Sequence, residues 1–237
     1  MIEIFATAEE AIADVPDGSN IMCGGFGLCG VPENLVRALG AKGTRNLTVI
    51  SNNAGVDTFG LGGLLANGQV KKILGSYFRS SEICARLQAS GALEVELLPQ
   101  GTMVERIRAA GAGVFGVYLS TGVGTCVAEG KEVRLFGATE CVLEYPLAAD
   151  YAFIRAYQGD RLGNLVYRKT ARNFNPVMAT AATVTVAEVE ELVEPGAIDP
   201  DHIITPGIYV QRIIQLNRLD KRIEQRTVRP RPSDCRE

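Results

Sequence analysis

Short apolar runs alternate with amphipathic stretches along the first half of the chain. The runs have the length and composition of buried parallel strands, and they lie at residues 20–23, 47–50, 70–74 and 93–98. The stretch after Pro32 instead places Leu35, Val36 and Leu39 at helical spacing. A strand followed by a helix, repeated four times, predicts the α/β class: an open, mostly parallel sheet with helices on both faces.

The pattern changes after Gly111, where glycines become frequent. Strand-like runs follow one another at residues 114–119, 132–136 and 151–156, which predicts a continuation of the sheet with some antiparallel strands. Residues 184–193 show helical spacing with Glu188 and two further glutamates on the exposed side, and they predict a helix. We expect one domain over residues 1–217, followed by a basic tail over residues 218–237.

A glycine-rich turn separates the first predicted strand from the first long helix. It consists of Gly24, Gly25, Phe26, Gly27, Leu28, Cys29 and Gly30. Backbone N–H groups of glycines can approach an anion closely, and the helix that Pro32 opens would add its N-terminal N–H donors and its dipole. The sequence therefore predicts that these seven residues bind a phosphate-bearing ligand.

The same turn also fits other hypotheses. Gly25, Gly27 and Gly30 match the G-x-G-x-x-G fingerprint of dinucleotide-binding proteins. Such a site needs an acidic side chain after the second strand to bind the ribose hydroxyls, but Asn52 and Asn53 stand there, which disfavours a nucleotide. A second alternative is that the glycines only make a tight turn between strand and helix.

Polar side chains follow the other three predicted strands. Asn52 and Asn53 come after the second strand, Ser76 and Tyr77 after the third, and Gln100 after the fourth. Carboxyl ends of parallel strands share one edge of a sheet, where amides and hydroxyls can donate to a substrate oxygen without adding a charge. We expect Asn52, Gln100 and, less strongly, Asn53 to contact the substrate, since neighbours at a strand end point to opposite faces. Taken singly, each is an ordinary turn former.

Composition and charge argue against a membrane-binding, a metal-binding and a nucleic-acid-binding protein. A chain of 237 residues with 46% apolar residues can bury one large core. It has no apolar run of membrane-spanning length and no signal-peptide features, so we expect a cytoplasmic protein that binds no membrane. Six cysteines without C-x-x-C spacing and a single histidine predict no metal site. Residues 218–237 hold seven basic and four acidic side chains but no aromatic one, and the body is acidic, which argues against nucleic-acid binding.

Ordered blocks along the chain resemble the class I coenzyme A-transferase family. Asp17-Gly18, an apolar run, the turn from Gly24 and a Gly30-x-Pro32 step are similar to its signature, with Cys23 where an aliphatic residue is usual. Further blocks resemble the alpha subunit of 3-oxoacid CoA-transferases, and they lie at residues 51–57, 60–62, 94–97, 99–101, 105–109, 111–113, 121–125, 130–132, 163–164, 170–176 and 205–209. The resemblance covers almost the whole chain and implies the CoA-transferase (NagB/RpiA-like) fold.

The blocks leave the acid substrate open. Residues 221–224 are similar to family members that move CoA from succinyl-CoA to a 3-oxo acid such as acetoacetate. Residues 202–207 are more like members that act on 3-oxoadipate, and Arg-Ser-Ser at 79–81 departs from the succinyl-CoA-dependent members. Transfer to 3-oxoadipate or a short-chain fatty acid is therefore an alternative. A non-catalytic module that binds a nucleotide or sugar phosphate is a further one.

The resemblance also implies a ping-pong reaction and a partner chain. A glutamate carboxylate attacks the acyl-CoA thioester, an anhydride forms, and the CoA thiolate then gives a glutamyl-CoA thioester that passes CoA to the second acid. In this family the glutamate belongs to the beta subunit, in a Ser-Glu-Asn-Gly segment that this sequence lacks. We expect no catalytic nucleophile here, activity only with the beta subunit in a heterotetramer, and CoA as a substrate rather than a permanently bound cofactor.

Overall fold

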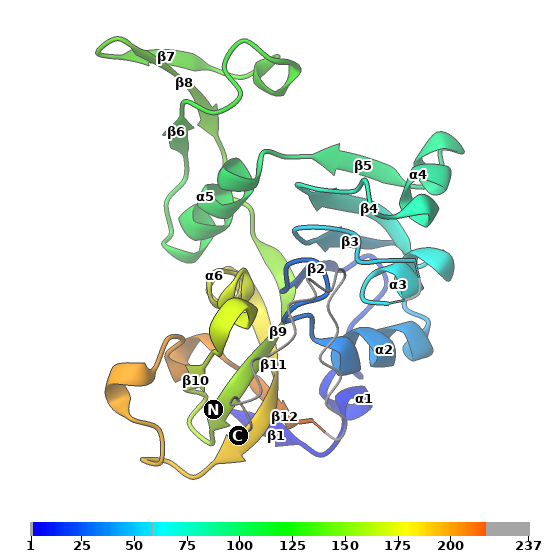
Figure 1. The fold of residues 1–237 in the computed structure, drawn as a ribbon, viewed down its shortest axis with the longest axis vertical. Coiled ribbons are helices and arrows are strands. Elements are labelled where there is room, and N and C mark those ends of the chain that lie inside the picture. Colours follow the sequence, from blue (N-terminus) through cyan, green and yellow to red (C-terminus); the bar gives the residue numbers. More distant parts are fainter. Residues whose placement is uncertain (1, 58, 217–237) are drawn as a thin grey trace, which may run out of the picture.

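The computed structural model describes residues 2–57 and 59–216, whose main feature is one large sheet covered by helices on both faces (Figure 1). The strands of this sheet are β1 (Glu3–Phe5), β2 (Asn20–Cys23), β3 (Leu47–Ile50), β4 (Val70–Gly75), β5 (Glu94–Leu97), β9 (Ala149–Asp160), β10 (Leu165–Val166), β11 (Ala182–Val193) and β12 (Arg212–Gln215). Eight of them run parallel in the order β1-β12-β11-β9-β2-β3-β4-β5, and β10 pairs antiparallel with β9.

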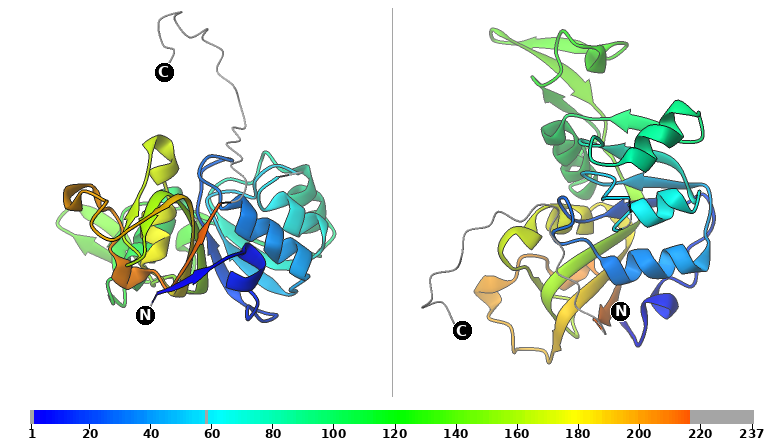
Figure 2. Two further views of the ribbon diagram at one scale, coloured as in Figure 1. Left: turned by 90° about the horizontal axis from the view of Figure 1, so that it is seen from below. Right: turned by 45° about the vertical axis from the view of Figure 1, so that its right-hand side comes forward.

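Helices cover the two faces of the sheet separately (Figure 2). They are α1 (Ala8–Ala11), α2 (Glu33–Lys42), α3 (Gly62–Ala66), α4 (Glu82–Ala89), α5 (Gln100–Gly111) and α6 (Asn175–Ala179). Helices α1 to α4 pack into one apolar core, and α5 and α6 pack into the other. Neighbouring residues of β2 divide between them, since Ile21 belongs to the first core and Met22 to the second. This double burial explains why the central strands are continuously apolar.

The predicted alternation of four strands and four helices is confirmed from β2 to α5. The predicted helix over residues 184–193 is wrong, because this stretch lies within β11, between β9 and β12. Its β-branched residues Val184, Thr185 and Val186 suit a strand. Glu188, expected on an exposed helix face, is fully buried.

A second, smaller sheet projects from the body as an arm (Figures 1 and 2). It consists of β6 (Val117–Leu119), β7 (Val133–Phe136) and β8 (Thr139–Glu144), antiparallel in the order β6-β8-β7. The expected antiparallel strands are present, but apart from β10 they form this separate sheet. We refer to residues 114–146 as the arm, and its exposed apolar side chains are Val114, Phe115, Val133, Leu135, Phe136 and Tyr145.

Two expectations from the sequence concern the C-terminal tail and membrane-spanning segments. The predicted basic tail, residues 218–237, lies outside the described residues. Within residues 2–57 and 59–216, no helix combines the length and the apolar character needed to cross a membrane.

Candidate functional site

A pocket of about 360 Å³ opens at the carboxyl ends of β2, β3 and β4 and the start of α5. It is lined by Phe26, Gly27, Asn52, Asn53, Ser76, Tyr77 and Gln100. We call it the amide pocket. The parallel order of β2, β3, β4 and β5 brings these residues together, because their strand ends meet at the same edge of the sheet.

Asn52 is the centre of a hydrogen-bond network in this pocket. Its side-chain oxygen Oδ1 accepts one bond from Ser76 Oγ and one from Gln100 Nε2, each 2.7 Å long. Its backbone oxygen accepts bonds from the N–H groups of Ser76 and Tyr77. The side chain is buried, and within the described part of the chain its Nδ2 group has no partner. The Nδ2 N–H groups of Asn52 are therefore fixed donors that a ligand can use.

Asn53 and Gln100 have different roles in this network. Asn53 Oδ1 accepts the N–H of Gly55 at 3.2 Å, which shapes the turn after β3. Gln100 is the first residue of α5, and its amide nitrogen donates to Asn52. Gln100 thus holds the amide that offers the free donor, while Asn53 stabilises its own loop.

The glycine turn contributes only part of its length to the pocket. Phe26 and Gly27 line it, and Phe26 is 53% exposed. Reciprocal backbone bonds of 3.0 Å between Phe26 and Cys29 close the turn, and Gly27 has a φ of +58°, a left-handed conformation that glycine adopts without strain. The other five predicted residues do not line the pocket; they are Gly24, Gly25, Leu28, Cys29 and Gly30.

Helix α2 does not offer the N-terminal donors expected for a phosphate. The N–H groups of Asn34 and Leu35 already donate to Glu188 Oε2, at 2.9 and 3.2 Å. A second carboxylate, that of Glu33, lies in the first turn of the same helix. The positive end of the helix dipole is compensated inside the protein. The amide pocket also contains no charged side chain among the described residues, so its chemistry favours an uncharged segment of a ligand over a phosphate.

Glu188 gives the folded protein a predictable pH dependence. Burial raises the pKa of its carboxyl from 4.5 to about 7, although the Arg155 charge and two backbone donors oppose the shift. Between these two values the folded state binds more protons than the unfolded state, so the free energy of unfolding falls as pH rises. Relative to Glu188→Gln, the wild-type protein should lose ~3 kcal/mol from pH 4.5 to pH 8, by 1.36 kcal/mol per pKa unit. Urea unfolding of both proteins at several pH values measures this difference, and a pH-independent difference would contradict it.

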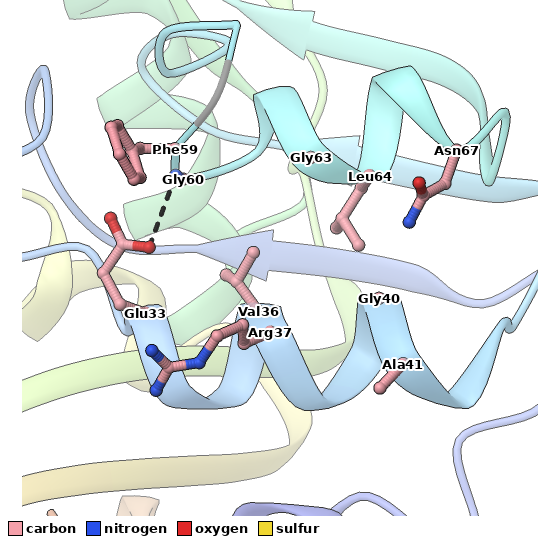
Figure 3. Close-up of a pocket in the computed structure, with 10 residues that line it drawn as sticks. All are labelled: Glu33, Val36, Arg37, Gly40, Ala41, Phe59, Gly60, Gly63, Leu64 and Asn67. Carbon is pink, nitrogen blue, oxygen red and sulfur yellow. Dashed lines mark hydrogen bonds between the residues drawn. The ribbon is translucent and has the colours of Figure 1, made fainter. Parts of the chain in front are cut away.

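A second groove of about 360 Å³ lies between α2 and α3 (Figure 3). Glu33 stands at one end, where its Oε2 accepts the N–H of Gly60 at 3.3 Å. The groove also contains the oppositely charged side chain of Arg37. None of the residues that the sequence predicted for the site lines it. The amide pocket is therefore the candidate functional site.

Several glutamates of this chain form ion pairs outside the amide pocket. Glu94 and Glu96 both pair with Lys72, at 2.7 and 2.8 Å. Glu144 is buried and pairs with Lys131. In the part of the chain that the structure describes, no glutamate lines the amide pocket, and the pocket therefore contains no carboxylate nucleophile of this chain.

Sequence reasoning missed the residues that support the glycine turn from behind. Asn173 donates to the carbonyl of Cys29, and Asn175 donates to that of Gly30. Both belong to the block at residues 170–176, which the sequence showed only as a resemblance. Their contacts cross more than 140 residues of sequence, so no local pattern could have revealed them.

Comparisons with a family model and with known proteins all match this chain to coenzyme A transferases. Residues 5–216 match the family model described as Coenzyme A transferase. The succinyl-CoA:3-ketoacid coenzyme A transferase of Xanthomonas campestris pv. campestris has an A subunit that is 54% identical over 226 residues, with 95% of this chain and 93% of the relative covered. The A subunit of the enzyme of the same name from Helicobacter pylori is 50% identical over 229 residues, with 97% and 99% covered.

A solved structure has the same fold. It is the thioester complex of an acyl-CoA transferase from E. coli O157:H7 with CoA, with a TM-score of 0.82 at 23% sequence identity. The similarity covers 93% of this chain but 48% of that one, so this chain spans about half the length of the E. coli protein.

Proposed function

The chain belongs to the coenzyme A transferase family, and we propose that it is the alpha (A) subunit of a heteromeric enzyme that moves CoA from succinyl-CoA to a 3-oxo acid such as acetoacetate. The observation that carries this proposal is identity of 50% or more, over nearly the full length, to two proteins named for that activity and that subunit. CoA is then a substrate that enters and leaves.

The amide pocket suits the thioester end of the substrate. Attack of a carboxylate on the thioester carbonyl places negative charge on the carbonyl oxygen, and a fixed N–H donor stabilises that charge. Asn52 Nδ2 is such a donor, with its orientation set by Ser76 and Gln100. Because the pocket lining carries no charge, it neither neutralises nor repels the attacking carboxylate.

The glycine turn is the proposed contact for the CoA chain next to the thioester. Phe26 offers an exposed ring, and Gly27 lets a ligand approach the backbone at the pocket wall. The remaining members of the turn, from Gly24 to Gly30, act by shaping it. The phosphates of CoA are then held outside the amide pocket, since α2 directs its first-turn N–H groups at Glu188.

A partner chain completes the site in this proposal. The nucleophilic glutamate expected for the family is missing from the sequence and from the pocket. Exposed apolar side chains gather on the arm, and Phe26 and Tyr77 are half exposed at the pocket, as expected of surfaces that another chain covers. We propose the beta (B) subunit as that chain, in a cytoplasmic heterotetramer with two copies of each chain.

The acceptor acid is tested with the reconstituted complex. Initial rates of CoA transfer from succinyl-CoA are measured with acetoacetate, 3-oxoadipate and butyrate. We expect kcat/KM to be highest for acetoacetate, by about tenfold or more. This ratio corresponds to ~1.4 kcal/mol of preference in the free energy of the transition state. A higher kcat/KM with 3-oxoadipate or butyrate would replace acetoacetate as the acceptor. Absence of transfer to every acid would favour the non-catalytic phosphate-binding alternative.

A further inference from the structure

One block of the sequence has no role in the function proposed so far, although it touches the glycine turn. It comprises the short 3₁₀ helix Lys169–Arg172, Asn173, Phe174 and the first residue of α6, Asn175. Asn175 is fully buried between the turn and β9. A fully buried amide is costly unless its hydrogen bonds are made, so its partners indicate what it holds in place.

Asn175 ties three segments together through its side chain. Oδ1 accepts the N–H of Arg155 in β9 at 2.9 Å. Nδ2 donates to the carbonyl of Gly30 at 3.1 Å and to that of Ala171 at 2.8 Å. One amide therefore fixes the end of the glycine turn to the central strand β9 and to the 3₁₀ helix.

The two glycines at the ends of the turn are fitted to this block. A Cβ on Gly24 would lie 1.9 Å from Asn175 Oδ1, and a Cβ on Gly30 would lie 3.0 Å from Ala171 Cα. Close approach at both ends leaves the turn little freedom to shift. Asn173 adds a second tie, because its Nδ2 donates to the carbonyl of Cys29 at 3.0 Å.

The middle of the turn is free of these ties and faces the candidate site. Phe26 and Gly27 line the amide pocket, whereas Cys29 and Gly30 are bound from behind. We propose that Asn175, assisted by Asn173, is a positioning residue for CoA transfer that holds the glycine turn so that Phe26 and Gly27 face Asn52 across the pocket. This inference rests on the proposed function in so far as the turn contacts the CoA thioester.

The test compares two buried amides with the same chemistry and different locations. Asn175→Asp is isosteric and retains the acceptor for Arg155, but it loses both donors and places a carboxylate against two carbonyl oxygens. Gln69→Glu is the matched control, because Gln69 Nε2 also donates to two backbone carbonyls, those of Leu39 and Thr44. Asn173→Asp is the milder second variant, should Asn175→Asp fail to fold.

Each variant is assembled with the beta subunit, and three quantities are measured: the melting temperature, kcat/KM for succinyl-CoA, and hydrogen–deuterium exchange of the backbone amides in residues 24–31. We expect Asn175→Asp to lower kcat/KM and to speed exchange of these amides by about tenfold or more, because the buried donors that hold the turn are lost. Gln69→Glu should lower the melting temperature comparably while leaving the other two quantities within about twofold, since its contacts are to Leu39 near the C-terminal end of α2 and to Thr44 in the loop after α2, whereas the turn precedes the N-terminal end of α2.

The possible results distinguish a positioning role of Asn175 from a general loss of protein stability, and they distinguish both from a failure of the proposed function. Equal losses of kcat/KM in Asn175→Asp and Gln69→Glu would overturn the proposal, as would a loss of activity with unchanged exchange in residues 24–31. Faster exchange with unchanged kcat/KM would overturn the link between the turn and CoA transfer. If the wild-type complex itself transferred no CoA, the proposed function would fail, and the exchange data would still report whether Asn175 holds the turn.

Discussion

Purified without a partner chain, this protein is expected to catalyse no measurable transfer of CoA from succinyl-CoA to acetoacetate. The physical reason is the missing nucleophile: the amide pocket contains donors for an oxyanion but no carboxylate of this chain within the described residues. Without covalent capture of the acyl group, the pocket has no route to the thioester intermediate. Addition of the purified beta subunit should restore turnover in proportion to the complex formed.

The measurement is a coupled titration of the two chains. The concentration of this chain is fixed and that of the beta subunit is increased, while the rate of CoA transfer and the mass of the complex are recorded together. We expect the rate to saturate at the concentration at which assembly saturates. A beta subunit in which the glutamate of the Ser-Glu-Asn-Gly segment is replaced by glutamine is the matched control, since it should assemble and remain inactive. Turnover by this chain alone would refute the assignment of the nucleophile to the partner.

Asn52→Asp in the reconstituted complex is expected to lower kcat by about 10²–10³, the usual cost of losing one oxyanion donor. The variant keeps an oxygen to accept the bonds from Ser76 and Gln100, so the network and the fold are preserved. It replaces the Nδ2 donor by a second oxygen that repels the charge developing on the thioester carbonyl. The effect should fall on kcat more than on KM, because the charge develops only in the transition state.

Asn53→Asp is the control for this result, since it makes the same chemical change one residue along the chain. Asn53 Oδ1 accepts from Gly55, a bond that aspartate also makes, and we expect a change in kcat within about tenfold, well below the donor loss. Steady-state kinetics and thermal melting of both complexes decide the question. A rise in KM alone for Asn52→Asp would assign Asn52 to ground-state binding. Equal effects of the two variants would reject Asn52 as the specific donor.

The sequence predicted the candidate pocket because its parts obey a simple topological rule. Asn52, Ser76 and Gln100 each follow an apolar run whose neighbours in the sheet are also its neighbours in sequence. Once the runs are recognised as consecutive parallel strands, the polar residues after them must meet at one edge. Local patterns sufficed here because sequence order and spatial order coincide for β2, β3, β4 and β5.

Prediction failed where distant segments decide the environment of a residue. Glu188 was expected on an exposed helix because charged residues normally face water. It is buried in β11 because α2, more than 150 residues earlier, supplies two N–H donors to its carboxylate. The first-turn N–H groups of α2, which the sequence offered as donors for a phosphate, are bonded to Glu188 for the same reason, whereas ligand binding by the glycine turn itself stays a prediction. Asn175 went unnoticed because its partners Gly30 and Arg155 are brought to it only by the folded sheet.

The arm has a consequence for how the protein must be made. Its apolar side chains include Phe115 at 87% exposed and Leu135 at 61% exposed, and the described residues of the chain leave them uncovered. In the proposed complex, a newly synthesised molecule therefore exposes this apolar surface from the time it folds until the beta subunit binds. Matched synthesis of both chains limits that interval, and overexpression of this chain alone should send much of it into aggregates. Recombinant production is best done by co-expression from one transcript.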